Sequence, residues 1–142
     1  MKAALLEPQL QAKMYGKDSI IRFDEGLIGF NEFKHFVLVE TEEVKPFRVL
    51  QSADSTEVAF VVLDPRFRIA DYYNQIPARE WEAIGVTNPV NRLAFVIVNI
   101  GLNPREITAN LQAPLLVNYE RITDRQMILT NTGFGLRMAL LV

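Results

Sequence analysis

The sequence predicts a mainly β protein, a compact, antiparallel and barrel-like single domain with one short helix. Three observations predict it: short runs of Val, Ile, Leu and Phe recur along the chain, turn residues separate them, and a single stretch carries clear helix signals. The 142 residues fit one domain with a core of its own. Within residues 1–142 we expect a leader at 1–8 and an apolar tail at 131–142.

Strands are expected where β-branched and aromatic residues cluster between turns. The candidates are residues 19–23 (SIIRF), 36–39 (FVLV), 47–50 (FRVL), 58–63 (VAFVVL), 93–100 (LAFVIVNI), 115–117 (LLV) and 125–129 (RQMIL). Residues 9–15 alternate polar and apolar side chains before the turn at 16–18, a pattern that predicts a first hairpin. With the weaker candidates, roughly eight or nine strands are expected, at the spacing of an antiparallel sandwich or barrel.

One helix is expected, from Pro77 to Ile84. Pro77 suits the first helical position, Glu80 favours the positive end of the helix dipole, and Gly85 can end the helix. Trp81 and Ile84 are three residues apart, so they are expected to face the core together.

The charge balance argues against direct binding of RNA or DNA. Lys and Arg number 15 against 17 Asp and Glu, and the two signs are mixed along the chain, whereas a nucleic-acid binder needs a basic excess. The absence of cysteine excludes disulfides and thiolate metal sites and suits a reducing compartment. The longest apolar stretches, such as residues 93–98, are far too short to span a bilayer. We therefore expect a cytoplasmic protein.

Residues that carry catalysis are scarce. His35 is the only histidine, and its apolar neighbours are typical of a packed or surface residue. Neither a cysteine nor a serine in a G-x-S-x-G elbow is present to serve as its nucleophile. A metal site would have to rely on carboxylates, and the sequence contains no D-x-D-x-D-G loop. We therefore expect no cofactor, no metal and no enzymatic activity.

Several residues have a structural interpretation. Gly26 and Gly29 lack the lysine and third glycine of a phosphate loop, so we expect them to supply positive φ angles in a tight turn. Pro65 is expected to close the strand at 58–63. The large apolar residues predicted to form the core are Phe23, Leu27, Phe30, Phe47, Leu50, Phe60 and Phe95.

Five polar residues are candidates for partner binding. Glu40, Glu42 and Glu43 form the one dense acidic run, either a solvated loop or a surface that meets a basic partner or repels a polyanion held nearby. Asn110 and Gln112 are candidates for recognition, and capping of the neighbouring turn is the rival interpretation.

Pro114 interrupts the strand-like segment 110–118 (NLQAPLLVN). A proline removes a backbone donor, so it belongs on a strand edge or at a bulge. An edge is a place where another chain can pair, and a proline there also blunts such pairing. Both interpretations stay open.

Taken in order, these segments resemble the FliW family over about residues 9–130. The motifs that carry the resemblance are IRFDEGLIGF at 21–30, PFRVLQS at 46–52, AFVV at 59–62 followed by Asp64 and Pro65, AFVIV at 94–98 and TANLQAP at 108–114. Ile28 departs from the pattern, because proline is common at this position in the family.

The resemblance implies a regulatory binding protein that antagonises CsrA, an RNA-binding translational repressor, and that also binds flagellin. Unsecreted flagellin would occupy the protein and leave the repressor free; after export, the freed protein would bind the repressor, and flagellin translation would resume. Two alternatives stay open. One is a flagellin-specific chaperone without a regulatory partner, and the other is a small-ligand-binding barrel or enzyme with Gln51, Asn110 and Gln112 pointing into a pocket.

Overall fold

The computed structural model describes residues 13–14, 20–23, 26–27, 29–30, 32–40, 42–100, 106–118, 123–126, 135 and 138–139. The predicted leader at 1–8 and most of the tail at 131–142 lie outside this set. The strands are β1 (Lys13–Met14), β2 (Ile20–Phe23), β3 (His35–Glu40), β4 (Arg48–Ser52), β5 (Ala59–Leu63), β6 (Leu93–Asn99), β7 (Thr108–Ala109), β8 (Leu115–Asn118), β9 (Thr123–Gln126) and β10 (Met138–Ala139). The helices are α1 (Ala78–Ala83) and the 3-10 turns η2 (Glu42–Val44), η3 (Pro65–Phe67), η4 (Tyr72–Gln75) and η5 (Pro89–Asn91).

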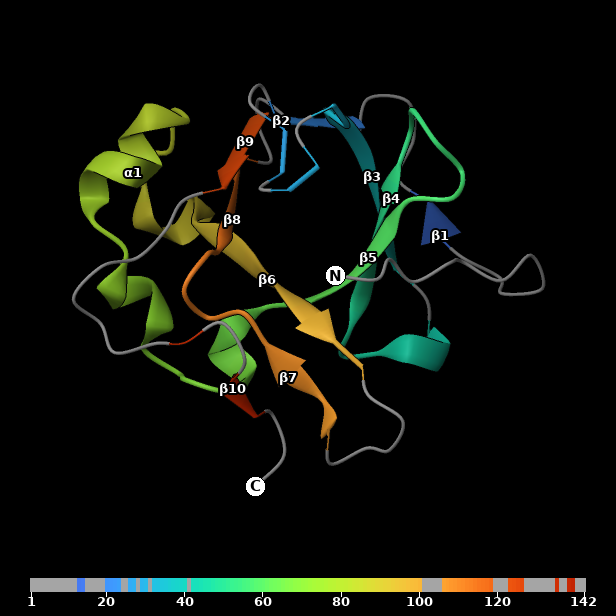
Figure 1. Cartoon of the computed structure of the whole chain (residues 1–142). Coiled ribbons are helices and arrows are strands. Elements are labelled where there is room, and N and C mark those ends of the chain that lie inside the picture. The colour runs from blue at the N-terminus through green and yellow to red at the C-terminus, as the bar shows by residue number, and fades with distance from the viewer. Residues whose placement is uncertain are drawn as a thin grey trace.

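Seven of these strands form a ring of paired neighbours. The order β6–β5–β4–β3–β2–β9–β8 returns to its start because β8 pairs with β6 as well as with β9. Among the described pairs only β2 and β9 run parallel. The strands β7 and β10 extend from the second half of β6, and β1 pairs with β3 (Figure 1). The predicted fold class, a mainly antiparallel β protein with one short α-helix, is confirmed.

The predicted first hairpin is wrong. β1 pairs with β3, through Met14 opposite Val39, and β2 pairs with a different part of β3, through Ile20 opposite Val37. Alternation of polar and apolar residues indicates a strand but does not determine which strand it pairs with. Here β1 and β2 both pair with β3. The turn at 16–18 lies outside the described residues.

Side chains that alternate along the strands fill the inside of the ring. Phe36 and Leu38 of β3 point inward, as do Phe60 and Val62 of β5. Their inner cluster also contains Ile21, Phe23, Leu27, Leu50, Phe95, Ile97, Leu115 and Val117. The space that eight of these apolar residues line is too small to hold a water molecule. The interior is therefore a packed core.

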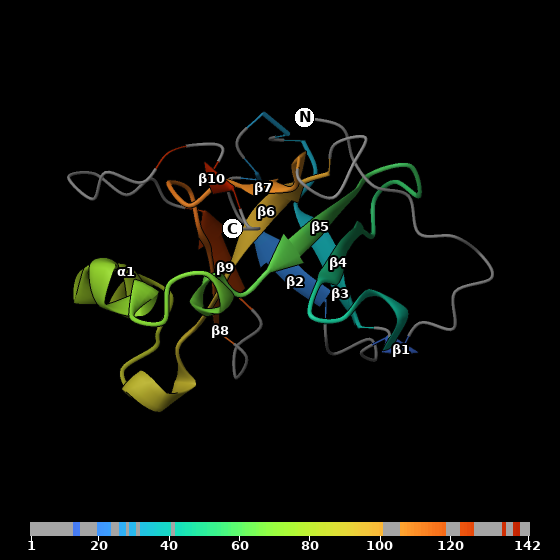
Figure 2. The same cartoon turned by 90° about the horizontal axis from the view of Figure 1, so that it is seen from below.

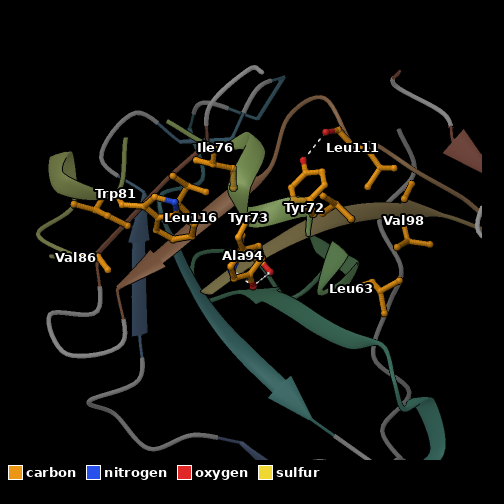
Figure 3. Packing of buried hydrophobic residues seen from close by; sticks show 13 residues of the cluster. Leu63, Tyr72, Tyr73, Ile76, Trp81, Val86, Ala94, Val98, Leu111 and Leu116 are labelled. Carbon is orange, nitrogen blue, oxygen red and sulfur yellow. Dashed lines mark hydrogen bonds between the residues drawn. The ribbon is translucent and has the colours of Figure 1, made fainter. Parts of the chain in front are cut away.

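A second core lies outside the ring, where helices cover β6 and β8. Ala94, Val96 and Val98 of β6 point outward into this cluster, and Trp81 of α1 and Leu116 of β8 join them (Figure 3). The two cartoon views place α1 on the side of β8 and β9, away from β1 (Figures 1 and 2). Both faces of β6 are buried, so its sequence reads as a continuous apolar run.

The helix is one residue shorter at each end than predicted. Pro77 is its N-cap, with ψ at 139°, instead of its first helical residue, and Ile84 is its C-cap. Gly85 follows with φ at 85°, where a glycine suits the left-handed conformation that ends a helix. Trp81 and Ile84 are both buried, as predicted. No helix in the described part of the chain is long and apolar enough to cross a membrane.

Candidate protein-binding surface

The acidic run lies between β3 and β4, and its exposed part is the turn η2. Glu42 has a side chain that is 85% exposed, and its Oε1 accepts a hydrogen bond from Lys45 Nζ at 2.9 Å. This bond raises the pKa of Lys45. Glu43 is exposed as well. The turn therefore presents two carboxylates, and Lys45 lies beside that of Glu42.

Glu40 is not part of that solvated turn, contrary to the first of the two interpretations of the acidic run. It occupies the last position of β3 on the same face as Phe36 and Leu38, which points into the ring. Its Oε1 accepts a hydrogen bond from Arg48 Nε at 3.1 Å, and the Arg48 guanidinium lies 5.2 Å from the ring centroid of Phe95. The ion pair thus covers one end of the apolar interior.

Asn110 caps a turn. Its Oδ1 accepts hydrogen bonds from the backbone N–H groups of Gln112 at 3.1 Å and Ala113 at 3.2 Å. These bonds match the rival interpretation, in which Asn110 shapes the turn before β8. Gln112 is half-buried. Pro114 is buried and lies just before β8. Because β8 pairs with both β6 and β9, it is not an edge strand, so Pro114 does not block pairing at a sheet edge.

Two other polar residues singled out from the sequence also serve turns. Gln51 donates from Nε2 to the carbonyl oxygens of Ser55 and Val58, inside the β4–β5 connection. His35 is exposed, with Nδ1 3.4 Å from Asp54 Oδ2. Gln51 and Asn110 therefore do not point into a pocket, and the packed interior gives no support to the ligand-binding alternative.

The glycine-containing motif forms a tight turn at one mouth of the ring. Gly26 and Gly29 have φ angles of 70° and 86°, as predicted, and the Phe30 N–H donates to the Leu27 carbonyl at 2.7 Å. Leu27 is buried, while Phe30 is only partly buried and packs edge-on against Phe60 with 5.1 Å between ring centroids.

The remaining residues predicted to be core differ in burial. Phe23, Leu50, Phe60 and Phe95 are buried in the inner cluster. Phe47, which precedes β4, is only partly buried and packs against the outer cluster. Phe30 and Phe47 were thus predicted to be more buried than they are.

The turn η3 begins at Pro65 just after β5, as predicted, and also carries Arg66 and Phe67, which the sequence did not mark as functional residues. Pro65 is buried, and Asp64 caps the turn by accepting from the Arg66 N–H at 3.0 Å. Arg66 also binds the Asp64 carboxylate with Nε and Nη2, and its guanidinium lies 4.2 Å from the ring centroid of Tyr73. The sequence D-P-R-F, an Asp before a proline, is the local signal that could have identified this capped turn.

Tyr73 anchors that turn to the sheet. Its hydroxyl oxygen accepts a hydrogen bond from the Ala94 N–H at 2.7 Å (Figure 3). The same hydroxyl group lies 3.1 Å from Asp64 Oδ2. Burial, with the nearby Asp64 carboxylate, raises the pKa of Tyr73 well above its ordinary value. The neighbouring Tyr72 donates to the Leu111 carbonyl and has a pKa raised by burial. Both tyrosines are therefore fixed and neutral.

Comparison with known proteins adds the observation that assigns the fold to a family. A family model described as FliW protein matches residues 8–140. The chain belongs to the FliW family. This membership places it among the flagellar assembly factors, which act with protein partners.

The similar proteins cover almost the whole FliW chain. The flagellar assembly factor FliW of Leptospira interrogans serovar Lai is 37% identical over 139 residues, which cover 94% of this chain and 93% of the relative. The flagellar assembly factor FliW of Caldanaerobacter subterraneus is 38% identical over 128 residues, covering 89% and 85%. A crystal structure of the flagellar assembly factor FliW superposes with a TM-score of 0.80 at 31% identity, covering 90% of this chain and 89% of the other.

Proposed function

We propose that this FliW chain works by binding, not by catalysis: it antagonises a CsrA-type translational repressor and binds flagellin, and so couples flagellin synthesis to flagellar assembly. Family membership supports the proposal, because the resemblance implies both partners. The feedback requires only that two partners compete for one protein with affinities near their cellular concentrations.

The distribution of the acidic residues supports one mode of antagonism. Glu40 faces into the ring and is neutralised by Arg48, and Glu42 has Lys45 beside it. An RNA presents one negative charge at every phosphate, so a protein that occupied the whole RNA groove would have to replace several charges. The two exposed carboxylates on η2 are too few to replace the phosphate charges of an RNA over the whole groove. We infer that the chain binds the repressor outside the RNA groove and that Glu42 and Glu43 repel RNA from nearby.

A titration distinguishes this remote mode from direct competition. The repressor is titrated with its RNA at several fixed concentrations of the chain. Under the remote mode the apparent RNA affinity falls to a plateau, because the coupling free energy between two sites is finite and reciprocal. A loss of RNA affinity that grows without limit as the chain is added contradicts the remote mode and indicates groove occupancy.

Charge variants test the role of the turn itself. Glu42→Gln with Glu43→Gln removes both exposed carboxylates and leaves the Glu40–Arg48 pair intact. The antagonism is expected to weaken mainly at low salt, because exposed charges are screened over about 10 Å at 0.1 M ionic strength. Glu57→Gln with Glu82→Gln is the matched control, since both residues are exposed carboxylates outside η2, in the β4–β5 connection and in α1. Equal effects of the two double variants would show that only net charge matters.

Binding measurements with flagellin and with the repressor, made side by side, examine the chaperone alternative. A chain that binds flagellin but gives no signal with the repressor, at any salt concentration, would be a flagellin-specific chaperone. A chain that binds both partners has the regulatory function proposed here.

A further inference from the structure

One aromatic side chain of the described residues is displayed to solvent on a fixed turn. Phe67, the last residue of η3, is 68% exposed. Hydrogen bonds fix the backbone around it: the Phe67 N–H donates to the Asp64 carbonyl, and the Arg68 N–H donates to the Pro65 carbonyl. The Arg66 side chain donates hydrogen bonds to the Asp64 carboxylate. The backbone that carries the ring is therefore preorganised, so less chain freedom is lost when a partner covers the ring.

The segment around the Phe67 side chain has a net positive charge. Arg66 balances Asp64, which leaves Arg68 as the unbalanced charge of residues 64–68. Arg68 donates from Nε to the carbonyl oxygen of Ala139 at 3.0 Å, so its guanidinium is positioned beside β10. Aromatic and arginine side chains are the types enriched at the centres of protein interfaces.

The turn η3 lies at the same end of the sheet as the acidic turn η2. The turn η2 leads into β4, and η3 follows β5, while Arg48 at the start of β4 pairs with Val62 near the end of β5. Both turns therefore leave the same end of the β4–β5 pair, the lower end in Figure 1. A partner bound over Phe67 would crowd a partner bound over Glu42 and Glu43.

We propose that Phe67 and Arg68 form the docking surface for flagellin, through a flagellin segment that offers an apolar side chain next to a carboxylate. This inference rests on the proposed function, which names flagellin as a partner. An unassembled subunit exposes the apolar surface that it will bury in its polymer, and such surface suits the Phe67 ring. The carboxylate complements Arg68. A lipid surface fits less well, because membrane-binding patches cluster about four to eight basic residues and this turn has two.

Affinity for purified monomeric flagellin tests the surface directly. Phe67→Ser is expected to weaken binding at least about tenfold, as truncation of an interface anchor does. Arg68→Gln is expected to weaken it a few-fold and to reduce its salt dependence. The matched control is Val90→Ser, because Val90 is 83% exposed on a similarly capped turn, η5. The control should bind within about twofold of the unaltered chain, since exposed apolar residues are common away from interfaces.

Thermal unfolding accompanies each titration, because a loss of binding counts only if the variant is folded. The inference is overturned if Phe67→Ser keeps the affinity of the unaltered chain, or if Val90→Ser loses as much affinity as Phe67→Ser. It is also overturned if Phe67→Ser abolishes binding to vesicles of phosphatidylserine and phosphatidylcholine while flagellin affinity is unchanged. An unaltered chain that binds neither flagellin nor the repressor defeats the proposed function itself, which separates the two failures.

Discussion

Arg48 and Glu40 form a charged pair at the end of the ring: Arg48 Nε donates to Glu40 Oε1 at 3.1 Å from the neighbouring strand. Their side chains are 27% and 26% exposed, and the guanidinium lies over the Phe95 ring. The pair therefore separates the apolar interior from solvent with charges that neutralise each other. It also fixes the start of the connection that carries Glu42 and Glu43.

Breaking this pair should reduce stability moderately. Arg48→Met keeps much of the packing over Phe95 but removes the Arg48–Glu40 ion pair, so the free energy of unfolding should fall by about 1–2 kcal/mol. For a chain of this length that is a fall in melting temperature of roughly 2–8 °C. The exchanged double variant Glu40→Arg with Arg48→Glu should recover part of the loss. A double-mutant cycle with no coupling between the positions would contradict the pairing.

The inner phenylalanines should differ in their contribution according to burial. Phe60→Ala should lower the free energy of unfolding by about 3–5 kcal/mol, because a buried ring is lost and a cavity remains. Phe30→Ala should cost about 1–2 kcal/mol, since that ring is only partly buried. Urea unfolding measures both. Full stability of Phe60→Ala together with loss of a partner would mean that Phe60 serves recognition and not the core.

Much of this inner and outer arrangement follows from the sequence. Positions 36, 38 and 40 share one face of a strand, so the inward direction of Glu40 could have been deduced from that of Phe36. The helix end at Gly85 and the positive φ of Gly29 can be predicted from the sequence, because glycine adopts positive φ angles without the steric cost that other residues have.

Other features depend on contacts that are distant in sequence. The pairing of β1 with β3 cannot be predicted from the sequence of β1, because a strand of two residues has too short a hydrophobic pattern to specify its partner or register. The partial burial of Phe47 depends on the helical layer outside the ring. The exposure of Phe67 could not be predicted either, because a phenylalanine beside a proline-containing turn can equally well close a core.

Asn110 should act on stability and not on affinity. Asn110→Ala removes an acceptor shared by two backbone N–H groups and should cost about 1–2 kcal/mol of unfolding free energy. Asn110→Asp keeps the acceptor and should retain most of the stability. Gln112→Ala is the neighbouring control, with an expected change within about 0.5 kcal/mol. Normal stability of Asn110→Ala with weakened partner binding would restore the recognition hypothesis.

The buried tyrosines should make the chain sensitive to alkali. Burial raises the pKa of Tyr72 and of Tyr73 above the ordinary value of 10.0, so the folded chain keeps both phenols neutral where the unfolded chain ionises them. Their contribution to stability is therefore complete below pH 10 and is lost as the pH rises above it. Melting temperatures from pH 8 to 11 measure this fall. Tyr72→Phe should lower stability at neutral pH, by losing its bond to Leu111, but should flatten the alkaline fall; an unchanged alkaline slope would contradict the assignment.

Competition between the two proposed partners can be followed by the fluorescence anisotropy of a labelled CsrA-type repressor. The chain is added first until the anisotropy stops rising, and monomeric flagellin is then titrated in. We predict that flagellin returns the anisotropy to the value of the free repressor, because the two partners exclude each other at one end of the β4–β5 pair. An anisotropy that never rises on addition of the chain, or that stays high at saturating flagellin, would contradict the proposed function.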